Sequence, residues 1–492
     1  MCEKRGVPTV DSLVQDSENT VGQKPNEHCA VVGFYGTDGA FDWIYTSLRT
    51  LQHRGQESSG ISIFDGSRIN TVKVMGLVNE GFKSSVENGS IYSKLGGNIG
   101  VGHNRYSTAG AKDLSGAGPV TVSSLLGELA LSHNGEIVNQ VELREELKKK
   151  GITFQTQLDT EVLLMVLSRE ISEKGLKNGF KNAMSLLRGS YSCALIINDK
   201  LYAFRDPLGI RPLIFGKVGN NYIVASESSV VDVLGGKIIR DVEPGEVIEF
   251  FEGEYKTILN VPSMRTAHCM FEYVYFSRPD SVIDNVEVYN ARILMGRQLA
   301  KEAPVDADVV VPVPDSGRTQ AMGYALELGI EYSEGLFKNR YSERTFIMPT
   351  QSLRSNSVKI KLNPIKSAIA GKKVVLIDDS IVRGTTMRYI VSILRSAGAA
   401  EIHVRIGSPM IIAPCYLGVD MKTRDQFIAL NKSISDINAE IGSNSLSYLS
   451  LEGLKESIGL GPKSLCLGCL TGEYPVKIKG EKYTQQTALE SY

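Results

Sequence analysis

The sequence predicts two consecutive domains: a layered α+β domain with antiparallel sheets, then an α/β domain with a parallel sheet. In the first part, short β-branched segments are joined by turn sequences such as 198–200 and 219–221, as neighbouring antiparallel strands are. After Pro262, apolar strand segments alternate with helical segments, which indicates parallel strands with crossover helices. We place the boundary within residues 260–268.

The composition limits the classes of protein that the chain can represent. Its 492 residues carry 54 Lys and Arg against 55 Asp and Glu, a net charge of −1. This balance argues against a generally basic nucleic-acid binder and a polybasic membrane protein. We expect no membrane-spanning helix, because no run of about 18 apolar residues occurs. Residues 1–28 are polar, unlike a secretory signal, and are expected to form a loose extension. A cytoplasmic location is expected, where cysteines indicate metal or catalytic sites rather than disulfides.

The first domain is expected to begin with a strand at 29–36 that ends in a glycine turn. Its other strands are expected at 58–64, 99–101, 191–197, 201–204, 222–225 and 247–250, and its helices at 139–150 and 160–170. In the second domain, strands are expected at 308–312, 374–377 and 401–406, and helices at 318–328 and 387–397. Residues 420–465 are predicted to be a mostly helical, peripheral subdomain.

Cys29 directly follows the polar extension and is a candidate nucleophile, the alternative being a buried core cysteine. A thiolate that attacks an amide needs a base, an oxyanion hole and a partner for the charged end of its substrate. Arg105, on a turn after a strand, suits a carboxylate, and Asp159 suits an ammonium unless it only caps the following helix. The Asn134 amide and the Gly135 N–H, on another turn, suit the oxyanion hole.

Three histidines, His53, His103 and His133, are conventional candidates for the base, but none stands at a spacing that requires this role. Four segments around the candidate nucleophile resemble the glutaminase domain of the class II, N-terminal-nucleophile glutamine amidotransferases. They are Cys-Ala-Val-Val-Gly at 29–33, Leu-Gln-His-Arg-Gly-Gln-Glu at 51–57, Gly-His-Asn-Arg-Tyr-Ser-Thr at 102–108 and Ser-His-Asn-Gly-Glu at 132–136.

This resemblance implies an αββα sandwich over residues 29–262, in which Cys29 is the first residue of the mature chain and its own α-amino group is the base. Residues 1–28 are then a propeptide. An α-amino group titrates at ~7.7–8.0, which suits a base near neutral pH. The resemblance also implies that Arg105 and Asp159 bind the α-carboxylate and α-amino group of glutamine, and that Asn134 and Gly135 form the oxyanion hole.

A second constellation lies at 374–386, Val-Val-Leu-Ile-Asp-Asp-Ser-Ile-Val-Arg-Gly-Thr-Thr. The N–H groups of a small-residue loop and of a helix start suit a phosphate. The carboxylates of Asp378 and Asp379 suit ribose hydroxyls and a hydrated Mg²⁺. A Walker-B-like strand of a nucleotide hydrolase is the alternative, but the sequence contains no Gly-x4-Gly-Lys-Ser/Thr motif.

This stretch resembles the 5-phosphoribosyl 1-diphosphate (PRPP) signature of the type I phosphoribosyltransferases, whose fold is α/β with a parallel sheet. The implied PRPP-binding residues are Asp378, Asp379, Ser380, Arg383, Gly384, Thr385 and Thr386. Residues 311–318 resemble the pyrophosphate loop of that family and imply that Ser316 is a Mg²⁺ contact with the two aspartates. Residues 338–346 resemble its flexible loop, in which Arg344 binds PRPP and, with Lys359 and Lys361, neutralises pyrophosphate. Alternatively, Lys359 and Lys361 belong to a solvated basic surface and bind no pyrophosphate.

Cys466 and Cys469 form a ligand-style pair, and Cys269 and Cys415 lie far upstream. Four thiolates bind a zinc ion or a [4Fe–4S] cluster. Alternatively, Cys466 and Cys469 are a redox pair, and the other two cysteines are buried without a function. The segments 268–280, 414–418 and 465–472 resemble the cluster-binding segments of the iron–sulfur amidophosphoribosyltransferases, which implies a structural [4Fe–4S] cluster. Cys193 is expected in the core.

Together the resemblances imply an enzyme that hydrolyses glutamine at Cys29 and transfers ammonia to C1 of PRPP. The products are 5-phosphoribosylamine, pyrophosphate and glutamate, at the entry to purine synthesis. Arg54 and Tyr106 are expected to couple the two sites. The expected partners are glutamine, PRPP, Mg²⁺ and purine nucleotide inhibitors, with no nucleic acid or membrane, and the expected assembly is a homotetramer or homodimer.

Other classes of protein share parts of this pattern. Glucosamine-6-phosphate synthase and asparagine synthetase share the glutaminase half, but the first lacks the acid-pair loop and the second has an ATP-pyrophosphatase loop that we do not find in the sequence. A non-catalytic PRPP-sensing regulator that binds DNA would need a basic stripe or a helix-turn-helix. A degenerate paralogue would have lost Cys29, Arg105, Asn134 or Asp378, and all are present.

Overall fold

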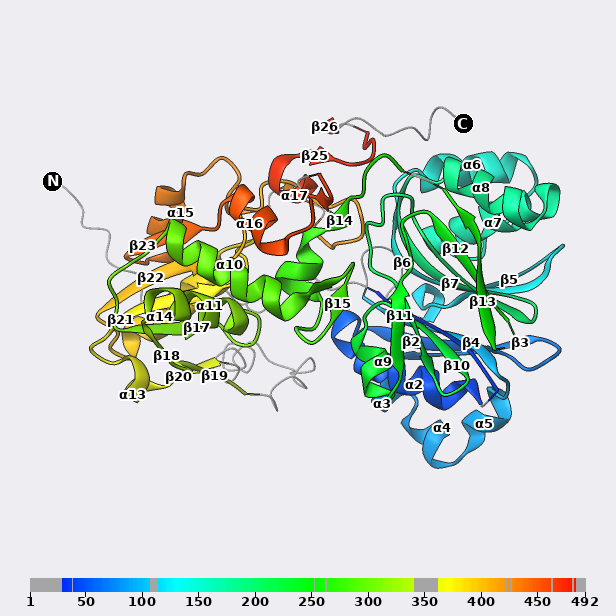
Figure 1. Cartoon of the computed structure of the whole chain (residues 1–492), viewed down its shortest axis with the longest axis horizontal. Helices are drawn as coiled ribbons and strands as arrows, with labels where there is room; N and C mark the ends of the chain where they lie inside the picture. The colour runs from blue at the N-terminus through cyan, green and yellow to red at the C-terminus, as the bar shows by residue number, and fades with distance from the viewer. Residues whose placement is uncertain are drawn as a thin grey trace, which may run out of the picture.

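The computed structural model describes residues 29–37, 39–106, 114–251, 253–261, 263–339, 362–421, 423–424, 427–461, 463–479 and 482–483. The expected propeptide at 1–28 lies outside the described residues. So do Arg344, Lys359 and Lys361 of the expected flexible loop and its surroundings. The described chain forms an antiparallel α+β domain and a parallel α/β domain, which lie side by side (Figure 1).

Two antiparallel sheets build the first domain (Figure 1). The seven-stranded sheet has the order β11-β9-β10-β1-β4-β2-β3, and the six-stranded sheet has the order β13-β12-β8-β7-β6-β5. The first sheet contains β1 (Ala30–Tyr35), β2 (Ser58–Phe64), β3 (Ile69–Met75), β4 (Ile99–Arg105), β9 (Ile214–Val218), β10 (Asn221–Ala225) and β11 (Lys237–Asp241). The second contains β5 (Val120–Ser124), β6 (Gly127–Ile137), β7 (Gly189–Ile197), β8 (Lys200–Arg205), β12 (Glu246–Phe251) and β13 (Glu254–Asn260). Val31 and Phe215 of the first sheet share one buried core with Ala194 and Ile248 of the second.

Helices cover the outer faces of both sheets. α2 (Ala40–Thr50) presents Phe41, Ile44 and Leu48 on one face, a helical spacing, and packs them on the seven-stranded sheet. The six-stranded sheet is covered by α6 (Gln140–Lys149), α7 (Asp159–Lys174) and α8 (Leu176–Leu186). The expected αββα sandwich is therefore confirmed.

Two strands of the first domain extend through residues that the sequence placed in turns. β4 was expected to end at 101 but continues to Arg105, because Ser58 pairs with Arg105 and Ala30 with Asn104 across the sheet. Asn134 also lies within a strand, opposite Ser192 of β7. Both segments consist of polar residues, so a prediction based on apolar runs does not include them in the strands.

A five-stranded parallel sheet, in the order β18-β17-β21-β22-β23, forms the second domain. Its strands are β17 (Val309–Pro312), β18 (Glu331–Tyr332), β21 (Lys373–Asp378), β22 (Glu401–Ile406) and β23 (Ser445–Tyr448). α10 (Val288–Glu302) and α11 (Arg318–Leu328) pack on one face. α14 (Thr385–Ser396) and α15 (Ile434–Ile441) pack on the other. The expected α/β architecture is confirmed.

The expectation of a mostly helical peripheral segment at 420–465 is wrong. This segment contains β23, the edge strand of the parallel sheet, whose Leu446 pairs with Val404 and is buried in the core. The sequence Ser-Leu-Ser-Tyr has one buried apolar residue, so no apolar run indicated a strand. Helices α15 and α16 (Leu451–Ile458) flank it.

Short elements complete the described structure. The first domain contains η1 (Gln52–Arg54), α3 (Val78–Gly81), α4 (Lys83–Glu87), α5 (Ser90–Lys94), η2 (Leu114–Gly116) and α9 (Ser229–Val233). The second contains β14 (His268–Cys269), η3 (Glu272–Phe276), β15 (Val282–Ile283), β16 (Val286–Glu287), β19 (Leu336–Lys338), β20 (Leu362–Pro364), α13 (Lys366–Ile369), β24 (Leu465–Cys466), α17 (Gly468–Thr471), β25 (Glu473–Tyr474) and β26 (Lys482–Tyr483). No helix among the described residues is long and apolar enough to cross a bilayer.

Candidate active site

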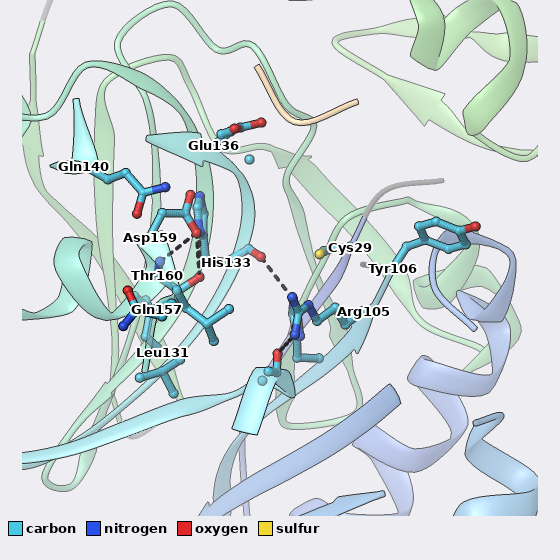
Figure 2. A pocket seen from close by; sticks show the side chains of 16 residues that line it. Cys29, Arg105, Tyr106, Leu131, His133, Glu136, Gln140, Gln157, Asp159 and Thr160 are labelled. Carbon is cyan, nitrogen blue, oxygen red and sulfur yellow. Dashed lines mark hydrogen bonds between the residues drawn. The ribbon is translucent and has the colours of Figure 1, made fainter. Parts of the chain in front are cut away.

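A pocket in the first domain collects most of the residues predicted for glutamine hydrolysis (Figure 2). Its lining includes Cys29, Arg105, Tyr106, Gly135 and Asp159. Cys29 stands just before β1, Arg105 ends β4, Gly135 lies in β6 and Asp159 begins α7. The pocket therefore lies where strands of both sheets meet the start of a helix, and the fold brings together residues that are far apart in the sequence.

Arg105 and Asp159 supply opposite charges to this pocket. Figure 2 places the Arg105 guanidinium near Cys29 and the Asp159 carboxylate across the pocket from it. Arg105 Nη1 donates a hydrogen bond to the Gly116 carbonyl oxygen, which fixes the side chain. Asp159 Oδ2 accepts from the Ile137 N–H at 3.0 Å, and its Oδ1 accepts from the Thr160 N–H at 2.8 Å. Asp159 thus stabilises the start of its own helix and lines the pocket as well.

Asn134 and Gly135 meet the steric and polar requirements of an oxyanion hole. Asn134 is 1% exposed, and its side-chain nitrogen has no hydrogen-bond partner among the described residues. Buried donors are normally paired, so this N–H stands out, although Asn134 itself is not among the pocket-lining residues. A Cβ at position 135 would lie 2.0 Å from the Ser190 carbonyl oxygen, so only glycine fits here.

Several groups adjust the acidity of the Cys29 thiol. Burial raises its pKa, whereas the Arg105 guanidinium and the Tyr106 backbone N–H lower it. His103, which also lines the pocket, is held neutral because burial lowers its pKa to about 3. The Tyr106 ring points away from the Cys29 sulfur (Figure 2).

Arg54 of η1 connects Cys29 to the second domain. Its Nε donates to the Cys29 carbonyl oxygen at 3.3 Å, and its Nη1 donates to Glu227 at 2.7 Å. The guanidinium also binds Glu272, in the second domain, through Nη1 and Nη2. His53, one of the candidate bases, binds Glu227 at 2.7 Å and is not among the pocket-lining residues.

The second predicted constellation lies at the carboxyl end of β21. Asp378 ends this strand, and Ser316 Oγ donates to Asp378 Oδ1 at 3.4 Å. A Cβ at Gly317 would lie 2.4 Å from the Ile377 carbonyl oxygen, so glycine allows the 314–317 loop to approach the acid pair. Ser380 Oγ donates to Asp379 Oδ2 at 2.6 Å. The loops after β17 and β21 therefore meet, as expected for open α/β sheets.

The loop after the acid pair leads into α14. Gly384 precedes the helix with φ +77°, and a Cβ there would lie 2.2 Å from Ile428. Thr385 and Thr386 open the helix, and Arg383 is half-buried before it. The first N–H groups of α14 thus face the same end of the sheet as the two aspartates, an arrangement that suits a phosphate. The predicted PRPP-binding residue Arg344 lies outside the described residues.

The four predicted ligand cysteines gather at the domain junction. β14 and β24 pair in parallel and set Cys269 opposite Cys466. The Cys469 carbonyl oxygen accepts from the N–H groups of Ile412 and Ala413 at 3.0 and 3.1 Å, close to Cys415 in the chain. Burial and then the neighbouring Cys269 raise the pKa of Cys466 to about 12.

The four thiols lie within electrostatic range of one another. No group of three or more His, Cys, Asp or Glu side chains in the described part of the chain stands close enough to hold one metal ion. All four cysteines are free of disulfides, and the buried Arg211 lies within electrostatic range of Cys269 and Cys415.

Comparison with known proteins agrees with this arrangement. A glutamine amidotransferase domain model matches residues 103–232, and a phosphoribosyl transferase domain model matches residues 287–406. The chain is 48% identical over 459 residues to the amidophosphoribosyltransferase of Methanothermobacter thermautotrophicus, covering 92% of this chain and 96% of that protein. The chain belongs to the amidophosphoribosyltransferase family. The Bacillus subtilis amidophosphoribosyltransferase is 44% identical over 458 residues, with 92% of this chain and 95% of that protein covered.

Two solved structures share the fold over 94% of this chain. The B. subtilis glutamine PRPP amidotransferase complexed with ADP and GMP has a TM-score of 0.83 and 42% identity, covering 94% of this chain and 99% of that chain. The structure described as the allosteric regulatory enzyme of purine biosynthesis has a TM-score of 0.84 and 43% identity. The expected enzyme class, a glutamine-dependent pentosyltransferase of the first step of purine synthesis, is thereby confirmed.

The residues that join the two domains were not predicted from the sequence. Glu272 stands in the segment that was interpreted only for Cys269, and Glu227 carries no motif. The available signal was an acidic residue inside the apolar run 270–276, because a carboxylate buried there needs a partner. Two pocket-lining glutamines, Gln140 and Gln157, were also missed, and no sequence pattern indicated them.

Proposed function

We propose that Cys29 is the nucleophile that hydrolyses glutamine, and that the ammonia released aminates PRPP at the acid-pair loop. The observation that carries this proposal is the unpaired, buried N–H of Asn134, next to Gly135 of the pocket that contains Cys29. A buried donor without a partner costs ~1–3 kcal/mol. An oxyanion formed from substrate would supply the missing partner.

In the first half-reaction, the Cys29 sulfur attacks the side-chain carbonyl carbon of glutamine. The S–C bond forms, and the oxygen takes negative charge between the Asn134 amide and the Gly135 N–H. The C–N bond then breaks, and the leaving nitrogen departs as ammonia with the thiol's proton. Water cleaves the thioester and releases glutamate. Arg105 binds the α-carboxylate of glutamine, and Asp159 binds its α-ammonium group.

The α-amino group of Cys29 serves as the base once residues 1–28 have been removed as a propeptide. Its ordinary pKa of ~7.7–8.0 suits proton transfer near neutral pH. Two observations support this role. Arg54 holds the Cys29 carbonyl oxygen at 3.3 Å, which orients the residue. The nearby His103 is neutral, with a pKa of about 3, and is a poor acceptor for the proton.

In the second half-reaction, ammonia attacks C1 of PRPP, and the bond from C1 to the pyrophosphate oxygen breaks. The extra proton of the new amine passes to the released pyrophosphate. Asp378 and Asp379 bind the ribose hydroxyls, while Ser380, Arg383, Gly384, Thr385 and Thr386 bind the 5-phosphate, and Arg344 binds pyrophosphate. Mg²⁺ held by Asp378, Asp379 and Ser316 would neutralise charge on the leaving pyrophosphate. The 3.4 Å hydrogen bond from Ser316 to Asp378 supports this assignment.

Cys269, Cys415, Cys466 and Cys469 are proposed to hold a [4Fe–4S] cluster, which would supply a structural cross-link between distant chain segments. Ammonia transfer needs no electrons, so a redox role is not required. Arg54 and Tyr106 are proposed to couple PRPP binding to glutamine hydrolysis. Purine nucleotides are proposed as inhibitors, because a relative was solved with ADP and GMP. A homotetramer or homodimer in the cytoplasm stays a prediction.

The test is to supply the anaerobically purified enzyme with glutamine, PRPP and Mg²⁺ and to measure glutamate and pyrophosphate together. We expect equal release of both, dependent on PRPP. Cys29→Ala should abolish the reaction with glutamine and keep synthesis from ammonia. Loss of both reactions in a folded Cys29→Ala variant would mean that the thiol is structural, and pyrophosphate release without glutamate would overturn the assignment of the first site.

A further inference from the structure

Gln157 lines the pocket that contains Cys29 and has no role in the two half-reactions. It stands two residues before Asp159, in the loop between α6 and α7, and it is exposed. Figure 2 shows its side chain on the same side of the pocket as Asp159 and Thr160, across from Cys29. Gln157 therefore lies at the part of the pocket that is assigned to the α-ammonium group of glutamine.

The backbone on both sides of Gln157 is fixed by an arginine of α6. Arg144 is 8% exposed. Its Nη1 donates to the Thr156 carbonyl oxygen and its Nη2 to the Leu158 carbonyl oxygen, both at 2.9 Å. The guanidinium also lies over the Phe154 ring, 4.3 Å from the ring centroid. This planar fork holds the residues directly before and after Gln157.

A glutamate of α7 holds the same loop. Glu161 is 2% exposed, and its Oε1 accepts from the Gln155 N–H at 2.7 Å. Its Oε2 accepts from the N–H and from the hydroxyl of Thr156, both at 2.7 Å. The same helix begins at Asp159. These charge-assisted hydrogen bonds fix the position of Gln157 relative to the Asp159 carboxylate.

The α-ammonium group of glutamine needs more acceptors than Asp159 supplies. An ammonium has three N–H donors. Each oxygen of the Asp159 carboxylate already accepts one backbone N–H, from Ile137 and from Thr160. A carboxylate oxygen has about two acceptor sites, so Asp159 can take at most about two further donors. A carboxamide oxygen beside it is a neutral acceptor for the third.

We infer that Gln157 is a specificity-determining residue, whose side-chain oxygen accepts a hydrogen bond from the α-ammonium group of glutamine beside Asp159. This inference rests on the proposed function, which places that ammonium at Asp159. A substrate without the amino group would leave both acceptors without a donor, and a site built for hydrogen bonds rejects such an analogue. Gln157 and Asp159 together thus favour substrates that carry a free α-amino group.

The experiment measures glutamate release by the full-length enzyme, with PRPP and Mg²⁺ present, over a range of glutamine concentrations. Gln157→Met keeps the length of the side chain and loses its oxygen. It should raise the KM for glutamine at least about tenfold with kcat retained, because hydrogen bonds to charged groups are strong and this one forms on substrate binding. Gln157→Glu keeps an acceptor oxygen and should retain a KM no higher than that of the parent. Gln155→Met is the matched control, because Gln155 is an exposed glutamine of the same loop that is not among the pocket-lining residues.

Glutaramate, which is glutamine without its α-amino group, identifies the contact. Tested as a competitive inhibitor, it should have the same inhibition constant in the parent and in Gln157→Met. An inhibition constant that rises as much as the KM would show that Gln157 contacts another part of the substrate, and would overturn the inference. If glutaramate does not inhibit the parent, the KM values of Gln157→Met and Gln157→Glu decide.

The outcomes separate this inference from the proposed function. A parental KM in Gln157→Met, or an equal rise in Gln155→Met, would overturn the role of Gln157 and leave the proposed function intact. An equal rise in Gln157→Met and Gln157→Glu would show that the oxygen is not the acceptor. A parent that releases no glutamate from glutamine would contradict the proposed function itself.

Discussion

Arg54 of the first domain and Glu272 of the second form a two-pronged ion pair, with Nη1 to Oε2 at 2.9 Å and Nη2 to Oε1 at 2.7 Å. Both side chains are almost completely buried, at 1% and 2% exposure. The same guanidinium binds Glu227 and the carbonyl oxygen of Cys29. The residue proposed as nucleophile is thus held by an arginine whose own geometry depends on the contact between the two domains.

Arg54→Gln is predicted to destabilise the enzyme strongly. The substitution leaves Glu227 and Glu272 buried without their cation, and breaking such a pair costs about 3–5 kcal/mol. Urea denaturation measures the loss. Arg278→Gln is the control, because Arg278 forms a 2.6 Å pair with Asp280 in which both side chains are partly exposed. That pair should contribute no more than ~1 kcal/mol, and an equal loss in both variants would contradict the argument.

Asn134→Ala is predicted to impair glutamine use without harming the fold. Removing one oxyanion-hole donor lowers kcat by about 10²–10³, so glutamate release should fall by that factor. Stability should stay the same or rise, because the deleted N–H has no hydrogen-bond partner in the described structure. Synthesis from ammonia should be retained, since it bypasses this pocket. A large loss of stability would instead indicate that the amide has a structural role.

The double substitution Asp378→Asn with Asp379→Asn is predicted to abolish synthesis from ammonia and to weaken PRPP binding. The carboxylates are assigned to the ribose hydroxyls and Mg²⁺, which an amide binds less well. Equilibrium binding of PRPP with Mg²⁺ and pyrophosphate release are the measurements. Asp306→Asn is the control, because Asp306 is 96% exposed and pairs with Lys373 at the opposite end of the same strand. Unchanged PRPP affinity in the double variant would refute the assigned role.

Local elements with regular patterns could be predicted from the sequence almost residue by residue. The strand Ser58–Phe64 and the helix Arg318–Leu328 have the predicted bounds. Alternating isoleucines mark the strand, and a glycine stands at each end of the helix. The strand that ends at Arg105 was predicted too short. Its last residues are polar because they belong to the pocket. Rules based on apolar periodicity fail where function requires polar side chains in a strand.

The pocket itself could be predicted because its residues stand in recognisable motifs, and the fold brings Cys29, Arg105, Gly135 and Asp159 together. The contacts at the domain junction could not be predicted. Arg54 and Glu272 are 218 residues apart, and their pairing depends on how the two domains dock. A single sequence carries no periodicity that indicates such a contact, so the role of Glu272 is seen only in the structure.

The last prediction concerns the four cysteines at that junction. Cys466→Ala should lower bound iron and labile sulfide well below the about four of each expected for the parent, and remove the broad visible absorption of a [4Fe–4S] protein. Cys466 lies opposite Cys269, and its loss removes one ligand. Cys193→Ala is the control, since Cys193 is fully buried in β7 among the core residues of the first domain and should leave the iron content unchanged. A colourless parent that binds zinc would contradict the cluster. Equal iron in the parent and in Cys466→Ala would show that this thiol is not a ligand, because a cluster held by the four cysteines needs each of them.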